Sequence, residues 1–307
     1  MRFAVMGTGG VGGYFGGRLA AAGEDVTFIA RGAHLDAILA NGLSITSGAG
    51  DVTIAPAQAT DTPASIGAVD CVLFTVKLYD TDPAGALIGP VVGPETMVVN
   101  LQNGIDGEER LAAIIGEDHV VGGVAYISAH IEAPGKISHA GKGAKLTFGE
   151  LDGTATPRIE ALAAACAKAG YEFEVSDDIQ GPLWSKLAML ASMSAVSCLT
   201  RLPIDVVART PETAALLRSA MEEVVQVARA KGVNLSDDTV QRVLSFGRSM
   251  GTSIKPSMLV DLERGKPLEV DHLSGAVVRA GAAAGVATPF HSMAAALLAP
   301  LAKGRAG

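Results

Sequence analysis

The residues best suited to bind a ligand form a glycine-rich turn near the start of the chain. The turn reads Gly7-Thr8-Gly9-Gly10-Val11-Gly12 and lies between an apolar strand pattern and an apolar helical run. Gly7 permits a tight turn, Gly9 has no Cβ and lets a pyrophosphate approach the backbone, and Gly12 allows the helix to pack closely on the strand. The start of the helix offers N–H groups to phosphates. We predict a dinucleotide-binding unit, although a glycine-rich loop without a ligand would share the pattern. The predicted cofactor contacts are Gly7, Gly9, Gly10, Val11 and Gly12.

The end of the second predicted strand indicates which dinucleotide binds. A site for NAD usually has Asp or Glu there, about 20 residues past the motif, to bond the ribose 2′-hydroxyl. Here the strand ends in Ala30-Arg31-Gly32, without an acid. The planar guanidinium of Arg31 can bind a 2′-phosphate. We therefore expect NADP(H), and the alternative is that Arg31 is a solvated charge.

Polar residues follow two further predicted strands. Lys77 comes after Thr75-Val76, and Asn103 lies in Asn100-Leu101-Gln102-Asn103-Gly104. An open α/β sheet binds its ligands at the carboxyl ends of its strands. Lys77 could therefore contact the cofactor or the substrate, and Asn103 could bond the nicotinamide ribose or a substrate oxygen. The structural alternatives are a surface lysine and an ordinary Asn-Gly turn.

Lys186 is the strongest candidate for proton transfer. It belongs to Trp184–Val196, one of the most apolar helical segments of the chain. Such a lysine would line a cleft, and desolvation would lower its pKa toward the range useful for proton transfer. Leu190 and Ser194 share its helical face at positions four and eight further on. The alternative is a lysine whose head group reaches the surface.

Candidate hydroxyl and carboxyl groups follow nearer the end of the chain. Ser257 comes directly after Pro256, where it could cap a helix or bond a carboxylate. Glu269 and Asp271 lie among apolar residues at the predicted start of another helix. A carboxylate there could pair with Lys186 or bind a substrate hydroxyl. It could also be a favourable charge at a helix N-terminus.

The pattern of elements predicts an α/β fold with two domains. Apolar runs alternate with helical patterns in the first half, which is typical of a parallel, doubly wound sheet. We expect strands at 2–6, 25–29, 71–76, 97–101, 119–124 and 171–175, with helices at 10–22, 33–40, 82–88, 107–115 and 157–169. We interpret residues 125–150 as a small antiparallel extension of the same sheet.

The sequence pattern predicts only helices in the second half of the chain. We expect them at 180–199, 212–231, 236–249, 257–264, 270–285 and 290–302. The predicted domains are therefore a dinucleotide-binding domain at 1–176 and a helical substrate and catalytic domain at 177–307. A ligand would bind in the cleft between them.

Composition excludes several classes of partner. The formal net charge of −8 argues against nucleic acid. The three cysteines, Cys71, Cys166 and Cys198, are far apart and read as buried, reduced thiols. The six histidines do not cluster with acids at metal spacing. No membrane span is expected, because the stretch closest to 18 uninterrupted apolar residues, 280–302, contains prolines and a histidine. No signal peptide is expected, because residues 1–6 already read as the first strand, without a basic region followed by a longer apolar run. We expect a cytoplasmic protein without a metal, and its alanine-rich helices could form a homodimer.

The ordered set of motifs resembles the ketopantoate reductase (2-dehydropantoate 2-reductase) family over nearly the whole chain. The similarity is carried by Gly7–Gly12, Arg31-Gly32, Thr75-Val76-Lys77, Leu101–Gly104, Lys186-Leu187, Pro256–Asp261 and Glu269-Val270-Asp271. It implies a Rossmann domain followed by a helical domain like that of 6-phosphogluconate dehydrogenases. It also implies reduction of a 2-oxo acid to the 2-hydroxy acid by NADPH.

The resemblance assigns a role to each candidate residue. Lys186 would be the general acid, and Glu269 would hold it or a substrate hydroxyl. Ser257 would bind the substrate carboxylate. Lys77 and Asn103 would contact cofactor and substrate, and Arg31 would hold the 2′-phosphate.

The chain departs from the family at two positions of the substrate pocket. Members typically carry asparagine four and eight residues after the catalytic lysine, where this chain has Leu190 and Ser194. We therefore expect a more apolar pocket and hypothesise a different 2-oxo acid as substrate. Two alternatives stay open: a dehydrogenase for another 2- or 3-hydroxy acid on the same scaffold, and a non-catalytic NADP(H) sensor.

Overall fold

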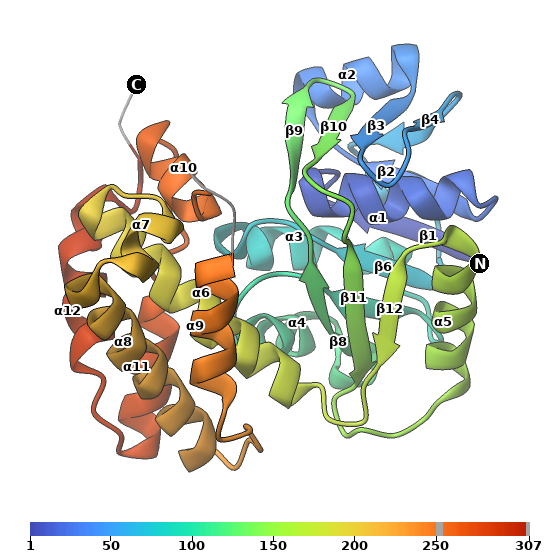
Figure 1. Ribbon diagram of the computed structural model, residues 1–307. Helices are drawn as coiled ribbons and strands as arrows, with labels where there is room; N and C mark the ends of the chain where they lie inside the picture. Colours follow the sequence, from blue (N-terminus) through green and yellow to red (C-terminus); the bar gives the residue numbers. More distant parts are fainter. Residues whose placement is uncertain (250–253, 305–307) are drawn as a thin grey trace. The chain divides into compact units, whose positions relative to one another are not determined.

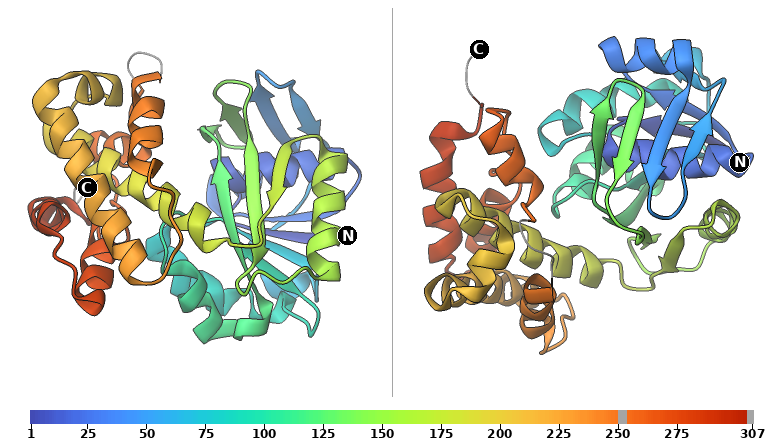
Figure 2. Two further views of the ribbon diagram at one scale, coloured as in Figure 1. Left: turned by 60° about the horizontal axis from the view of Figure 1, so that its bottom comes forward. Right: turned by 45° about the horizontal axis from the view of Figure 1, so that its top comes forward.

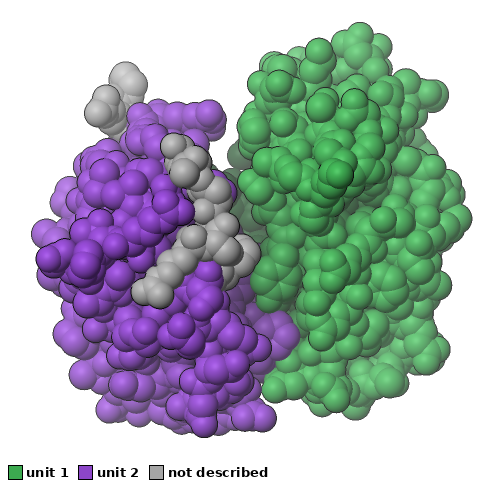
Figure 3. Space-filling model, viewed as in Figure 1, with its two compact units in different colours: residues 1–102, 107–179 green, residues 103–106, 180–307 purple. Residues whose placement is uncertain are grey.

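The computed structural model describes residues 1–249 and 254–304, and the chain forms two compact units (Figures 1 and 3). The first unit comprises residues 1–102 and 107–179, and the second comprises residues 103–106 and 180–307. A single boundary along the chain does not describe this division, because the short segment 103–106 groups with the second unit.

An eight-stranded sheet organises the first unit. Its order is β12-β11-β8-β7-β6-β1-β2-β5, and all neighbours are parallel except β8 and β11. The strands are β1 (Arg2–Met6), β2 (Asp25–Ile29), β5 (Gln58–Thr60), β6 (Cys71–Phe74), β7 (Met97–Asn100), β8 (Val120–Tyr126), β11 (Lys145–Glu150) and β12 (Glu172–Val175). The central strands are predominantly apolar because both of their faces are covered. The predicted doubly wound α/β fold is confirmed.

Helices cover both faces of this sheet. They are α1 (Gly10–Ala21), α2 (Gly32–Asn41), α3 (Thr81–Leu87), α4 (Gly107–Ile115) and α5 (Pro157–Ala169). Alternate residues of β1 point to opposite faces. Phe3 and Val5 pack in a core with residues of α1 and α5. Ala4 and Met6 pack in a second core with residues of α3 and α4. The bounds of β1, β2, α4 and α5 agree with the sequence prediction.

A second, four-stranded sheet corrects the interpretation of residues 125–150. Its order is β4-β3-β10-β9, with β3 (Leu43–Ser47), β4 (Val52–Ile54), β9 (Ala129–Ala133) and β10 (Lys136–His139). The β9–β10 hairpin therefore does not extend the main sheet, whereas β11 does. It lies beside β3 and β4 (Figure 2), with β10 parallel to β3. The strand pattern alone could not reveal a partner about ninety residues away, and β3, β4 and β5 were missed altogether.

The second unit is helical, as predicted. Its helices are α6 (Gln180–Thr200), α7 (Ile204–Arg209), α8 (Pro211–Ala230), α9 (Thr239–Ser249), α10 (Ser257–Glu263), α11 (Ser274–Ala284) and α12 (Pro289–Leu298). The sequence prediction missed α7, because this helix is short and lies between Pro203 and Pro211, and prolines usually interrupt helices. Short 3-10 helices occur at Pro63–Ser65, Leu78–Asp80, Gly89–Val91, Glu117–His119 and Ala299–Leu301.

Helix α6 forms the centre of the helical unit. Trp184, Leu187 and Ala188 are buried in a core shared with α8, α10 and α11. Among the residues described, α6 is the one helix long and apolar enough to cross a membrane. Because 67% of its most apolar window is buried within the protein, it has the character of a core helix.

Candidate active site

The glycine turn of the first unit is closely packed except at one position. Gly7 has a φ of 95°, and a Cβ there would lie 2.9 Å from the backbone nitrogen of Val76. A Cβ at Gly12 would overlap the Thr75 hydroxyl, and one at Gly10 would overlap the carbonyl of Ala129. At Gly9 the nearest atom would be 4.0 Å away. Gly9 is therefore the position where the protein itself leaves the backbone open to a close approach.

The start of α1 is suited to an anion. Gly9 is its N-cap residue, and within the described chain no side chain bonds the helix terminus and no acid lies in its first turn. The Thr8 hydroxyl donates instead to the carbonyl of Ile29 at 3.0 Å, which fixes the turn to the end of β2. Unpaired N–H groups and the helix dipole favour a phosphate at such an end.

The strand register brings three candidate segments to one edge of the sheet. Met6 pairs with Ile29 on one side and with Phe74 on the other, so β1, β2 and β6 end level. The glycine turn, Arg31 and Lys77 follow these three ends. The arrangement supports a single nucleotide-binding edge in the first unit.

Arg31 and Lys77 differ in their surroundings. The Arg31 side chain is 89% exposed, and its guanidinium lies 3.5 Å from the Asp80 carboxylate. Exposed pairs of this kind are weak and exchange readily for a stronger anion. Lys77 is half-buried at the start of the Leu78–Asp80 turn. The exposed guanidinium of Arg31 is therefore accessible to a phosphate.

Gln102 is a residue of this edge whose contacts the sequence did not reveal. Its side-chain amide donates to the Val76 carbonyl at 3.0 Å and to the Thr81 hydroxyl at 2.9 Å. These bonds connect the loop after β7 to the loop after β6 and to the first residue of α3. Its position next to Asn103 was the one feature of the sequence that could have indicated a role for Gln102. Its hydrogen-bond partners lie more than twenty residues away in the sequence.

In the helical unit, Lys186 and Glu269 are electrostatically coupled. Lys186 is half-buried on α6 between the buried residues Trp184 and Leu187. Burial lowers the pKa of Lys186 to about 8, and the negative charge of Glu269 opposes that shift. Glu269 is only 4% exposed. It lies five residues before α11, so the alternative of a charge in the first turn of that helix is wrong.

The remaining predicted substrate residues also belong to the helical unit. Leu190 is half-buried and Ser194 is buried, on the same face of α6 as Lys186. Ser257 is exposed as the first residue of α10, next to Met258 and Leu259 of the core that contains Leu187. Pro256 is the N-cap, and among the described residues no side chain caps α10, so Ser257 does not have the capping role. Asn103 is half-buried in the segment 103–106.

Cysteines and potential metal ligands complete the description of reactive groups. Cys71, Cys166 and Cys198 are free and buried, and burial raises the pKa of each thiol. They are inert side chains of the core. In residues 1–249 and 254–304, no group of three or more histidines, cysteines and acids could hold a metal ion.

Comparison with known proteins places both units in one family. The model of "Ketopantoate reductase PanE/ApbA" matches residues 3–153, and that of its C-terminal domain matches residues 178–302. A 2-dehydropantoate 2-reductase of Mesorhizobium japonicum is 35% identical over 94% of each chain. One of Caulobacter vibrioides is 33% identical over 96% of this chain and 97% of its own.

Solved structures agree with these relatives. A 2-dehydropantoate 2-reductase of Geobacter metallireducens superposes with a TM-score of 0.93 at 34% identity, covering 98% of this chain and 99% of its own. D-mandelate dehydrogenase, solved with NADH, shares the fold at a TM-score of 0.87 and 22% identity, over 98% of both chains. The chain therefore belongs to the ketopantoate reductase family of oxidoreductases.

Proposed function

We propose that this protein reduces a 2-oxo acid, 2-dehydropantoate or a related one, to the 2-hydroxy acid with NADPH, and that Lys186 is the general acid. The coupling of Lys186 to the buried Glu269 carries the proposal. It places an ammonium group of lowered pKa in the unit that the C-terminal family model matches. The bound nucleotide supplies the hydride that adds to the carbonyl carbon.

Lys186 would stabilise the negative charge that develops on the carbonyl oxygen. Its ammonium stabilises the alkoxide by charge and then donates a proton to it. One proton and one hydride are thereby added across the carbonyl. Because the pKa of Lys186 is about 8, the group is protonated near neutral pH yet releases its proton more readily than an ordinary lysine.

Glu269 would keep this ammonium charged and oriented. Burial alone favours the neutral amine, whereas a neighbouring carboxylate favours the ammonium. The balance between the two sets the pH at which the general acid is available. Glu269 could also bond a substrate hydroxyl, as the family resemblance implies.

The first unit would bind the nucleotide. The pyrophosphate of the nucleotide would bind at Gly9 and the start of α1, where the backbone is open. The turn around it would be shaped by Gly7, Gly10, Val11 and Gly12. We assign the 2′-phosphate to Arg31 and Lys77. No acid lies directly after β2 to select NADH, and within the described chain Arg31 forms a weak, exposed pair with Asp80.

The substrate would bind to the helical unit. The hydroxyl of Ser257 would donate to the substrate carboxylate, and Asn103 to a substrate oxygen. Leu190 and Ser194 would line the side-chain end of the pocket, which is more apolar than one formed by two asparagines. We place this activity in the cytoplasm, in accord with the free, buried cysteines.

Replacing Lys186 by alanine tests the general acid. Lys186→Ala should lower kcat for 2-oxo acid reduction by about 10²–10⁴-fold. The dissociation constant of NADPH, measured by fluorescence titration, should stay the same because the nucleotide belongs to the first unit. Lys231→Ala, at an exposed lysine of the helical unit, is the control. A wild-type protein that binds NADPH yet reduces no 2-oxo acid would support a sensor instead.

The pH dependence of the reaction tests the coupling to Glu269. The general acid must be protonated, so kcat/KM should decline above about pH 8, by about tenfold per pH unit. Glu269→Gln removes the negative charge that raises the pKa of Lys186, and the decline should begin at a lower pH. A pH profile unchanged in Glu269→Gln would contradict the assignment.

Replacing Arg31 tests the cofactor. Arg31→Ala should raise the KM for NADPH by about 10–100-fold, as expected for charged hydrogen bonds to a phosphate, and change the KM for NADH little. Lys168→Ala is the matched control, because Lys168 pairs with Glu24 at the surface of the same unit. Equal effects of Arg31→Ala on both nucleotides would remove Arg31 from the 2′-phosphate site.

A panel of 2-oxo acids tests the altered pocket. The wild type should prefer an acid with an apolar side chain over 2-dehydropantoate, and Leu190→Asn should shift kcat/KM toward the hydroxylated acid by about tenfold. The rate of NADPH oxidation, followed by the absorbance of the reduced nicotinamide, measures both. If 2-dehydropantoate is clearly the best wild-type substrate, the altered-pocket hypothesis is wrong.

A further inference from the structure

The loop after β7 is divided between the two units. Leu101 and Gln102 belong to the first unit, Asn103–Asp106 to the second, and Gly107 begins α4 of the first again. The chain thus passes from one unit to the other and back within a few residues. Asn103, predicted to contact cofactor and substrate, lies on the helical side of this crossing.

An apolar contact anchors the segment to the helical unit. Ile105 is partly buried against a core that includes Trp184, Leu187 and Val270. Leu187 adjoins Lys186, and Val270 adjoins Glu269. The side chain of Ile105 therefore packs on the same core that positions the two catalytic candidates.

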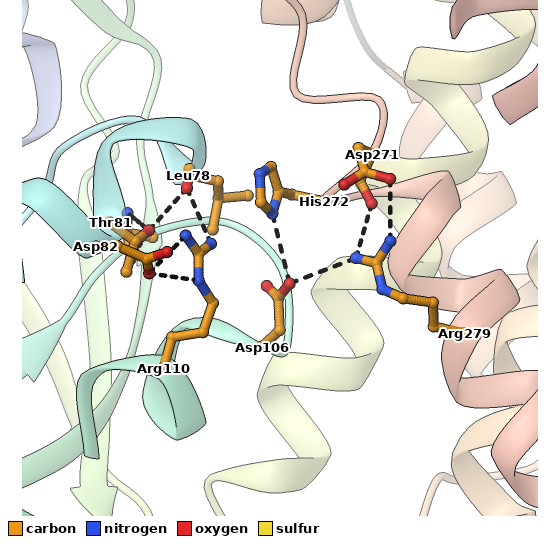
Figure 4. A network of polar contacts seen from close by, with 9 residues as sticks. Leu78, Thr81, Asp82, Asp106, Arg110, Asp271, His272 and Arg279 are labelled. Atoms are coloured by element: carbon orange, nitrogen blue, oxygen red, sulfur yellow. Dashed lines mark hydrogen bonds and ion pairs between the residues drawn. The ribbon is translucent and has the colours of Figure 1, made fainter. Parts of the chain in front are cut away.

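A hydrogen bond and an ion pair of Asp106 add a second anchor. One oxygen of its carboxylate lies 3.4 Å from Nδ1 of His272 and 3.6 Å from the guanidinium of Arg279 (Figure 4). The side chains of Asp106 and His272 are only 26% and 17% exposed, so water screens this pair less than a surface pair.

Arg279 is itself held in place for this contact. Its guanidinium donates to the side chain and to the backbone carbonyl of Asp271, each at 3.0 Å (Figure 4). A Cβ at Gly275 would lie 2.7 Å from the Asp271 carboxylate, so the glycine leaves room for this pair.

The turn that presents His272 also carries Glu269. The backbone N–H groups of His272 and Leu273 donate to the Glu269 carbonyl at 3.1 and 2.9 Å. Asp106 is therefore connected to Glu269 through one short, hydrogen-bonded turn.

On the other side of the crossing, Gln102 is bonded to the loops of the first unit. Its bonds to Val76 and Thr81 hold it to the sheet edge. The boundary between the two units falls between Gln102 and Asn103. The next residue, Gly104, has a φ of 103°, a backbone conformation that favours glycine.

We propose that Asp106 is a positioning residue, which anchors Asn103 to the helical unit through His272 and Arg279. Asn103 thereby keeps a fixed position relative to Lys186 and Glu269, which belong to the same unit. This inference depends on the proposed reductase function only for the role of Asn103.

A double-mutant cycle tests the proposal. Asp106→Ala should raise the KM for the 2-oxo acid about tenfold and leave the dissociation constant of NADPH unchanged. In an Asn103→Ala background, Asp106→Ala should have little further effect on kcat/KM, because the residue it positions is gone. Asp237→Ala is the matched control, because Asp237 pairs with Arg229 elsewhere on the helical unit.

Amide hydrogen exchange provides a measurement independent of turnover. Asp106→Ala should speed exchange in residues 103–106 and leave β7 unchanged. Effects of Asp106→Ala and Asn103→Ala that simply multiply, or an unchanged exchange rate in 103–106, would overturn the proposal. A wild type that reduces no 2-oxo acid would count against the proposed function alone, and the exchange rates would still decide this inference.

Discussion

In the mechanism that we propose, the chemistry depends on the balance of two opposing effects on the ammonium group of Lys186. Burial on α6 lowers the pKa of Lys186, and the Glu269 carboxylate limits the fall. Without burial the lysine would hold its proton too firmly, and without the carboxylate it would lose its charge near neutral pH. Both conditions require an apolar helical core, which explains why a charged residue lies between buried Trp184 and Leu187.

The nucleotide requires a different environment, which the first unit provides. Phosphates need backbone N–H groups and positive charge at an open edge, whereas the general acid needs a dry one. The level ends of β1, β2 and β6 align the glycine turn, Arg31 and Lys77 at that edge. Dividing the two environments between two units would satisfy both demands, and the segment 103–106 adds part of the loop after β7 to the helical unit.

The sequence predicted best what depends on local pattern. Strands β1 and β2 and helix α4 were predicted with their observed bounds because their apolar periodicity is unambiguous. Lys186 was singled out because a lysine in an apolar helix is locally anomalous. The β9–β10 hairpin was assigned to the wrong sheet, and Gln102 and Asp106 were not recognised. In each case the deciding partner is distant in sequence, as with Asp106 and His272, which are 166 residues apart.

The arrangement on α6 also separates reaction from substrate choice. Leu190 and Ser194 lie one and two turns beyond Lys186 on the same helical face. Changing their polarity alters what the pocket can hydrogen-bond, while the turn that carries Glu269 stays the same. If Lys186 is the general acid as we propose, relatives could diverge in substrate without a change at that residue. The apolar residue at position 190 of this chain fits that kind of divergence.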